Sequence, residues 1–184
     1  NSLFYYTLTP KTTKAVLVLF PSAFESCESV ISSNKNLIQK SFDKGIMTVV
    51  ISSNFNRSLS LDNFALDFIN TTFLEIATKY NAPKEKFILC GLSLGGMNAL
   101  RYTEMSQDKN YYTSIKPIAV IGVDPPVDEM GLYKRALDEV NLYQTDSAKL
   151  DNGQQSALAE GKMLVSDFNA TYGGSPELTP KKYI

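Results

Sequence analysis

The sequence contains no histidine among its 184 residues. Histidine is the side chain whose ordinary pKa lies closest to neutrality, so the chain has no ready-made proton shuttle at neutral pH. It also offers no imidazole to a metal ion, and its two cysteines, Cys27 and Cys90, cannot complete a zinc site alone. Two cysteines are too few for a disulfide framework, so free thiols are expected.

Long runs of one kind of residue are missing as well. The chain has 18 Lys and Arg against 19 Asp and Glu, a net charge of −1, and no long basic run. This composition argues against binding nucleic acid through its phosphate backbone. No apolar run approaches the roughly 18 residues needed to span a bilayer. Because the chain begins with Asn1, the lack of a targeting segment predicts nothing about its compartment.

What the sequence does contain is an alternation of apolar strands and helices. The apolar fraction of 43% is enough for a folded core, and the length suits one domain. Unbroken apolar runs such as 15–20 are typical of strands buried on both faces. Strands are expected at 4–9, 15–20, 46–51, 87–90 and 117–123, and helices at 28–44, 61–80 and 96–106. The pattern predicts an α/β fold with a mostly parallel sheet and flanking helices.

The ends of the chain's elements carry their own signals. Ser60 is the expected N-cap of the helix at 61–80, with Asp62 in its first turn. After Pro126 the pattern changes to two helical segments, at about 131–143 and 154–172, with no strand-like run. We therefore expect a core of residues 1–126 and a helical region of residues 127–184 within the same domain.

One motif carries chemistry, the G-x-S-x-G sequence centred on Ser93. It lies between an apolar strand and a helix, where a serine on a sharp, strained turn is exposed at the end of the sheet. Gly91 and Gly95 avoid clashes with the neighbouring strand and helix. The helix start presents the N–H of Leu94, which can stabilise an oxyanion. The structural alternative is a serine in an ordinary glycine-rich turn.

Residues 91–96 resemble the nucleophile elbow of the α/β-hydrolase superfamily, which includes serine esterases, lipases and peptidases. Residues 15–24 resemble its third strand and oxyanion loop, and residues 46–51 resemble its fourth strand. The resemblance extends over about 4–124, with strands resembling the second to the sixth, and makes 127–184 a lid-like region. It implies a serine hydrolase that acts on an ester or amide by acyl-enzyme chemistry, without a metal or organic cofactor.

The same resemblance implies site residues. Ser93 is the nucleophile, and the N–H groups of Leu94 and Ala23 form the oxyanion hole, with Ser22 as the neighbouring alternative to Ala23. The family's histidine follows its last strand, so we expect the histidine and the usual acid in a C-terminal portion beyond Ile184. Asp124 is either a triad acid in a less common position or a turn residue, and we favour the turn.

Two other functions stay open. A relative that has lost its base keeps the fold, so the chain could be a non-catalytic binding or scaffold protein. Alternatively, Ser93 could work with a lysine, as in Ser-Lys enzymes. The oligomeric state is not predicted.

Overall fold

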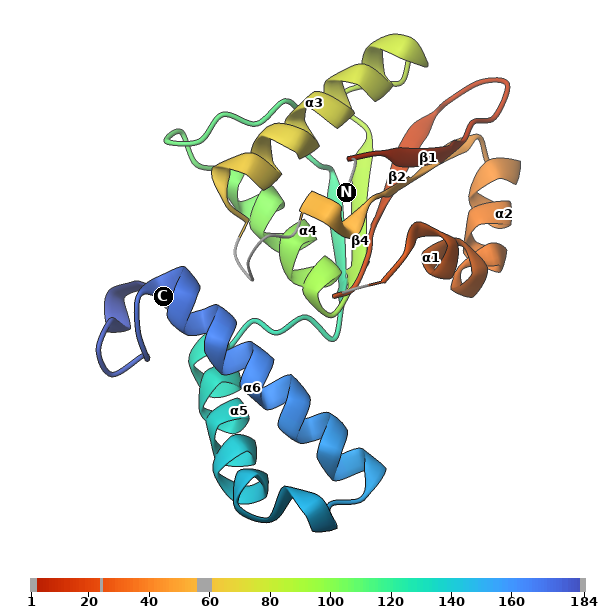
Figure 1. The fold of residues 1–184 in the computed structure, drawn as a ribbon. Coiled ribbons are helices and arrows are strands. Elements are labelled where there is room, and N and C mark those ends of the chain that lie inside the picture. The colour runs from red at the N-terminus through yellow and green to blue at the C-terminus, as the bar shows by residue number, and fades with distance from the viewer. Residues whose placement is uncertain (1–2, 24, 56–60, 183–184) are drawn as a thin grey trace. The chain divides into compact units, whose positions relative to one another are not determined.

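The computed structural model describes residues 3–23, 25–55 and 61–182 (Figure 1). The chain divides into two compact units, Asn1–Pro125 and Pro126–Ile184. That both units form one domain stays a prediction. In the described part of the chain, no helix is long and apolar enough to cross a membrane.

The first unit is built on a five-stranded sheet in the order β1-β3-β2-β4-β5. Strands β2, β3, β4 and β5 run parallel, and β1 pairs with β3 antiparallel. The strands are β1 (Tyr5–Leu8), β2 (Ala15–Phe20), β3 (Ile46–Ile51), β4 (Phe87–Leu92) and β5 (Ala119–Val123). The expected α/β class with a mostly parallel sheet is confirmed.

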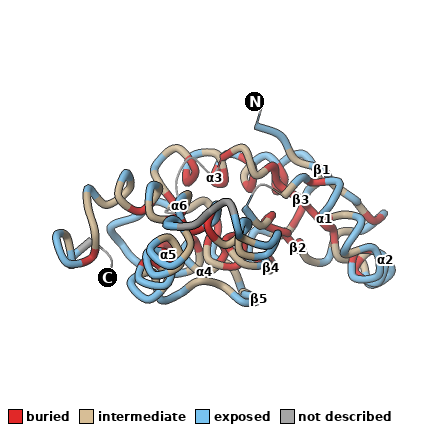
Figure 2. The backbone as a smooth tube through the Cα atoms, turned by 60° about the horizontal axis from the view of Figure 1, so that its bottom comes forward, coloured by how far each residue is buried: buried red, intermediate tan, exposed pale blue. Residues whose placement is uncertain are grey.

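Helices cover the two faces of this sheet (Figure 1). One face packs on the helices α1 (Cys27–Ser33) and α2 (Lys35–Asp43) through side chains such as Val30 and Ile38. The other face packs on α3 (Asn63–Lys79) and α4 (Leu94–Met105). Buried residues gather along the strands and on the helix sides that face them (Figure 2).

The strands differ in how deeply they are buried. In β2 every residue from Val16 to Phe20 is buried, as the unbroken apolar run predicts. In contrast, β5 is an edge strand that pairs, within the part of the chain that the structure describes, only with β4, and Ile121 is 50% exposed. An apolar sequence therefore predicted a strand at β5 correctly, but its position at the edge of the sheet depends on strand order.

Two expected helix boundaries are wrong. The helix expected at 28–44 is two helices, because Asn34 has φ −112° and ψ 19° and its side-chain amide donates to the carbonyl of Val30. At the start of α3 the N-cap is Asp62, whose carboxylate accepts from the N–H of Ala65. The expected N-cap, Ser60, lies outside the described residues. A short 3₁₀ helix, η1 (Ser53–Phe55), follows β3.

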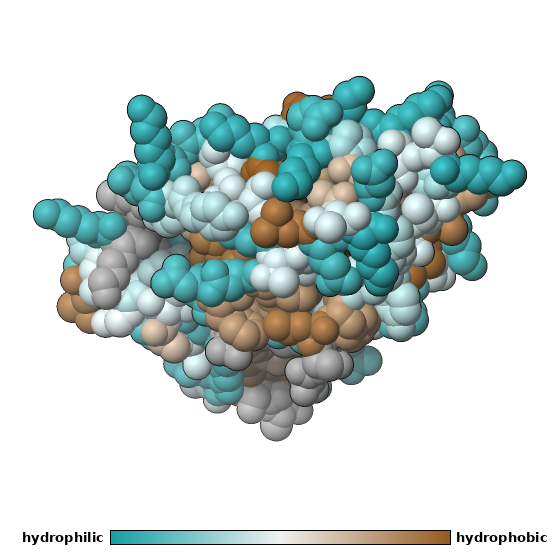
Figure 3. Space-filling view, turned by 90° about the horizontal axis from the view of Figure 1, so that it is seen from above, coloured by the Kyte–Doolittle hydropathy of each residue, from teal (hydrophilic) through white to brown (hydrophobic). Residues whose placement is uncertain are grey.

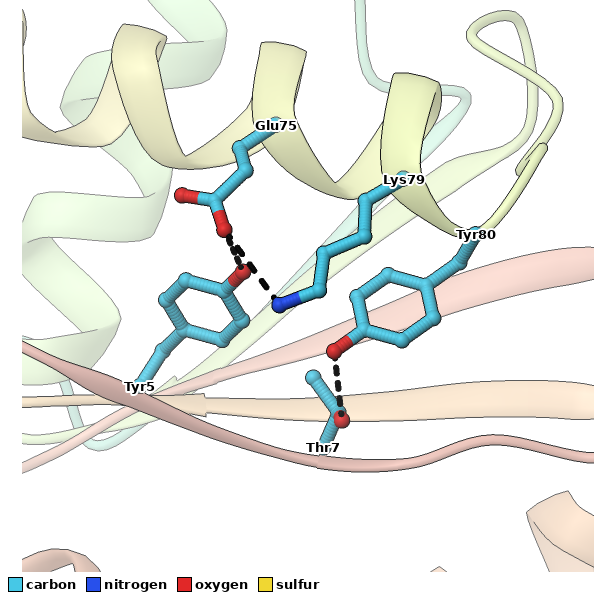
Figure 4. Close-up of polar contacts among 5 residues, drawn as sticks. All are labelled: Tyr5, Thr7, Glu75, Lys79 and Tyr80. Carbon is cyan, nitrogen blue, oxygen red and sulfur yellow. Dashed lines mark hydrogen bonds and ion pairs between the residues drawn. The ribbon is translucent and has the colours of Figure 1, made fainter.

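The edge strand β1 is attached to α3 by polar contacts (Figure 4). The hydroxyl of Tyr5 donates to Oε1 of Glu75 at 2.5 Å, and Nζ of Lys79 lies 3.7 Å from the same oxygen. The hydroxyl of Thr7 donates to that of Tyr80 at 3.5 Å. Burial and the Glu75 carboxylate raise the pKa of Tyr5, so its phenol stays a donor.

The second unit is a helical hairpin. It comprises α5 (Glu129–Tyr143), η2 (Gln144–Lys149), α6 (Asn152–Tyr172) and η3 (Pro180–Lys182). The helices approach closely at Gly161, where a Cβ would lie 2.9 Å from the carbonyl oxygen of Ala136. The rings of Tyr133 and Phe168 meet edge to face at 5.9 Å. No strand occurs among the described residues after Pro126, and both expected helices are found.

Candidate active site

Ser93 is the single residue between the end of β4 and the start of α4. Its backbone has φ 51° and ψ −123°, a strained conformation of the kind expected from the sequence. Such a conformation costs on the order of 1–3 kcal/mol and persists only where the surroundings enforce it. Two hydrogen bonds do so here: the Ser93 N–H donates to Val123, and the Met97 N–H donates to Ser93.

Glycines on both sides of Ser93 allow the turn to form. A Cβ on Gly91 would lie 2.2 Å from the carbonyl carbon of Gly95. A Cβ on Gly95 would lie 2.2 Å from the carbonyl oxygen of Phe20 and 2.5 Å from that of Pro21. Real Cβ atoms do not approach backbone this closely, so both positions require glycine. The short distance between Gly95 and Pro21 also places the start of the loop after β2 directly against the turn.

The start of α4 lies immediately after Ser93. Leu94 is the first residue of this helix, and the first N–H groups of a helix have no partner within it. Ser93 is the N-cap residue, but its side chain makes no capping hydrogen bond. Its hydroxyl is therefore not committed to holding the helix. The helix dipole adds a positive potential at this point, which favours a developing negative charge.

The loop after β2 is organised by Glu25. Oε2 of Glu25 accepts from the N–H of Ser22 at 3.0 Å, and the N–H of Glu25 donates to the carbonyl of Ser22 at 3.2 Å. Oε1 of Glu25 accepts from the hydroxyl of Ser29 on α1 at 3.2 Å. Since the Ser22 N–H is engaged, the N–H of the exposed Ala23 is the better candidate for an oxyanion donor. No signal in the sequence predicts this role of Glu25.

Asp124 lies next to Ser93 at the same edge of the sheet. The register pairs Leu92 with Val123, and Ser93 and Asp124 directly follow these two residues. Asp124 is exposed and has φ 48°, a left-handed conformation that Asp tolerates better than most residues. Its position is compatible with both the turn and the triad-acid interpretation.

The lysines that flank the sheet do not approach Ser93. Lys14, Lys44, Lys86 and Lys116 each lie just before a parallel strand, whereas Ser93 follows one. Strands of five or six residues at ~3.3 Å per residue separate these edges by about 20 Å. These four lysines are therefore too far from Ser93 to act as its base.

The cysteines do not compete with Ser93 as nucleophiles. Cys27 and Cys90 are free, as expected. Burial raises the pKa of the Cys27 thiol to about 11, and its Sγ donates to the carbonyl of Ile51 at 3.4 Å. Burial also raises the pKa of Cys90. Both thiols stay protonated at neutral pH, and the thiolate is the reactive form. The described residues include no cluster of His, Cys, Asp and Glu side chains that could hold a metal ion.

Neither a protein-family model nor a curated protein matches the sequence. Solved structures do match it, at low identity. FphF, a fluorophosphonate-binding serine hydrolase of Staphylococcus aureus, has a TM-score of 0.53 and 9% identity over 93% of this chain and 75% of that one. The α/β hydrolase GrgF from Penicillium sp. sh18 has a TM-score of 0.52 and 14% identity over 79% of this chain and 49% of that one.

An acetyl xylan esterase from Aspergillus awamori has a TM-score of 0.51 and 15% identity over 66% of this chain and 47% of that one. At such identities the likeness shows the fold alone. The chain spans about half the length of several of the solved structures that it matches.

Proposed function

Because this chain has the α/β-hydrolase fold, we propose that it acts as a serine hydrolase on an ester or amide. The observation that carries the proposal is the backbone of Ser93, held at φ 51° between two glycines that accept no side chain. An ordinary glycine-rich turn has no need of a strained serine. Strain of this kind gathers where a reactive group must be presented.

The proposed mechanism is acyl transfer in two steps. Oγ of Ser93 attacks the carbonyl carbon, and the oxyanion that forms is stabilised by the N–H groups of Leu94 and Ala23. The tetrahedral intermediate collapses, the leaving group departs with a proton, and the acyl group stays on Oγ. Water then attacks the acyl-enzyme and releases the acid. An ester is the favoured substrate class, since two structural neighbours are named as an arylesterase and an acetyl xylan esterase.

The step that removes the Ser93 proton needs a general base. The 184 residues include no histidine, so the proposal assigns this role to a histidine outside them. Asp124 is proposed as a turn residue beside the nucleophile rather than as the acid that orients the base. The helical unit 127–184 is proposed as a lid-like region.

A second function is favoured by the same absence of histidine. A protein that has the α/β-hydrolase fold but no general base would bind a ligand without hydrolysing it, and would act as a non-catalytic binding or scaffold protein. In that case Ser93 would keep its strained conformation without reacting with acylating reagents.

Labelling with a fluorophosphonate probe separates these functions. The full-length protein that contains the proposed histidine is treated with the probe, beside its Ser93→Ala variant and a control, Ser32→Ala, which removes an exposed hydroxyl from α1. We expect labelling of the parent and the control and none of Ser93→Ala. Labelling that survives in Ser93→Ala would refute Ser93 as the nucleophile. No labelling of a histidine-containing full-length protein would favour the binding protein.

A further inference from the structure

Four segments meet at the edge of the sheet where the parallel strands begin. We name this surface the basal edge; it comprises residues 9–14, 43–45, 81–86 and 107–118. Backbone hydrogen bonds join the segments to neighbouring strands. The Lys14 N–H donates to Gly45 at 2.8 Å, the Val16 N–H to Lys86 at 2.9 Å, and the Ile118 N–H to Phe87 at 2.9 Å. Residues that are far apart in the sequence are thereby held side by side.

The basal edge is strongly basic. It contains seven lysines and three carboxylates, which gives a surplus of four positive charges on a chain whose net charge is −1. All seven lysines are exposed, and the described residues offer them no ion pair. The lysines are Lys11, Lys14, Lys44, Lys84, Lys86, Lys109 and Lys116, and the carboxylates are Asp43, Glu85 and Asp108. Figure 3, seen from the end where β4 begins, shows long hydrophilic side chains extending from this face.

The described residues at the opposite edge of the sheet have the reverse charge. The described loop residues that follow the parallel strands include Glu25, Asp62 and Asp124 and no lysine. Among the described residues, charge is therefore separated along the strand direction, with Ser93 at the acidic edge. The strands are about 20 Å long, which exceeds the Debye length of about 8 Å in physiological salt. The electrostatic fields of the two edges are therefore largely independent of each other.

Two tyrosines project from the basal edge between Lys109 and Lys116. Tyr112 is 72% exposed and Tyr111 is 38% exposed. Their loop is held in place by the buried Asn70, which donates from Nδ2 to the carbonyl of Tyr112 and accepts at Oδ1 from the N–H of Ser114. The guanidinium of Arg101 lies 5.9 Å from the ring centroid of Tyr111, and Tyr112 is the more exposed of the two rings.

We propose that the basal edge is a docking surface for an anionic phospholipid membrane. Lysine is a strongly hydrated point charge that suits a diffuse negative surface, whereas geometry-specific phosphate recognition favours arginine. The four segments contain no arginine. Tyrosine is enriched at membrane interfaces because its ring is apolar and its hydroxyl stays hydrated. Docked in this way, the protein keeps Ser93 about 20 Å from the lipid.

Sedimentation with vesicles tests the proposal. Vesicles of phosphatidylcholine with about 30 mol % phosphatidylserine are compared with pure phosphatidylcholine, in about 0.05 M and about 0.5 M NaCl. We expect binding only to the anionic vesicles, with loss at high salt. The triple variant Lys84→Gln, Lys86→Gln and Lys116→Gln should bind about 100-fold more weakly.

A matched control removes the same charge from the second unit, as Lys134→Gln, Lys162→Gln and Lys181→Gln. These lysines are exposed on α5, α6 and η3. Equal losses in both triple variants would overturn the proposal, because net charge rather than the basal edge would then govern binding. Binding to soluble heparin without binding to vesicles would overturn it in favour of a polyanion.

Fluorescence reports whether Tyr112 enters the interface. The chain has no tryptophan, so Tyr112→Trp introduces a single reporter. Its emission should shift to the blue when anionic vesicles are added. The control Leu142→Trp places the reporter on α5 at a position that is 68% exposed, where no shift is expected. A shift in the control but not in Tyr112→Trp would assign the contact to another surface.

Discussion

The N–H of Ser93 donates a hydrogen bond of 2.9 Å to the carbonyl oxygen of Val123. This bond extends the pairing of β4 and β5 by one residue beyond the last strand pair, Leu92 and Val123. It also places the candidate nucleophile directly beside Asp124. Both Ser93 and Asp124 have positive φ, at 51° and 48°. The two adjacent strands thus both end in a left-handed residue at the same edge.

The glycines around Ser93 should accept no substitution. In Gly95→Ala the new Cβ would lie 2.2 Å from the carbonyl oxygen of Phe20, so the backbone must shift. We expect a loss of about 2–4 kcal/mol in unfolding free energy, measured by urea denaturation. The control is Gly153→Ala, whose Cβ meets only the Asp151 carboxylate, at 3.3 Å. Equal stability of the two variants would contradict the packing described here.

Relief of strain at Ser93 should stabilise the protein. Glycine adopts φ 51° without a Cβ penalty, so Ser93→Gly is expected to gain about 1 kcal/mol in unfolding free energy while losing fluorophosphonate labelling. Thermal denaturation measures the first effect. Asn81→Gly, at φ 48° after α3, is the comparison for a left-handed residue outside the candidate site. A destabilised Ser93→Gly would show that the hydroxyl supports the fold.

Asp124 should tolerate loss of its charge. Asn also accepts the left-handed conformation, so Asp124→Asn is expected to keep the native melting temperature and to change the labelling rate by less than about twofold. A triad acid behaves differently, because its replacement by Asn lowers the rate by about 10⁴-fold with the structure intact. A fall of that size would move Asp124 from the turn into the catalytic machinery.

Glu25 should act as a positioning residue for the loop after β2. Glu25→Ala removes the acceptor of the Ser22 N–H and leaves the turn that presents Ala23 unsupported. We expect the labelling rate to fall about tenfold, in the range for disturbing an oxyanion donor. Glu25→Gln keeps an oxygen acceptor and should restore most of the rate. If Glu25→Gln fails to restore the labelling rate at an unchanged melting temperature, the rate depends on the negative charge of Glu25 rather than on its hydrogen bond to Ser22.

Cys27 should make stability depend on pH in the alkaline range. Its raised pKa means that the folded protein holds the thiol proton more tightly than the unfolded chain does. The contribution is complete below about pH 9, the ordinary value, and is lost as pH rises toward about 11. Urea denaturation across this range should show a shallower decline in Cys27→Ala than in the parent. Ser32→Ala on the same helix should decline like the parent.

Much of the fold follows from local pattern. The runs 15–20 and 46–51 match β2 and β3 residue for residue, because a buried parallel strand needs an unbroken apolar segment. Helix boundaries were harder to predict, since the break at Asn34 and the N-cap at Asp62 each depend on a hydrogen bond between one side chain and a nearby backbone group. The spacing of apolar residues along the chain does not specify such a hydrogen bond.

The sequence by itself determined the turn at Ser93, because the demands on Gly91, Ser93 and Gly95 arise largely within one short segment. Only the tertiary structure placed Asp124 beside Ser93 and engaged the Ser22 N–H with Glu25. It also gathered seven separated lysines at one edge of a chain that has no basic run. These relations depend on strand order and register, which are determined by packing between segments distant in the sequence.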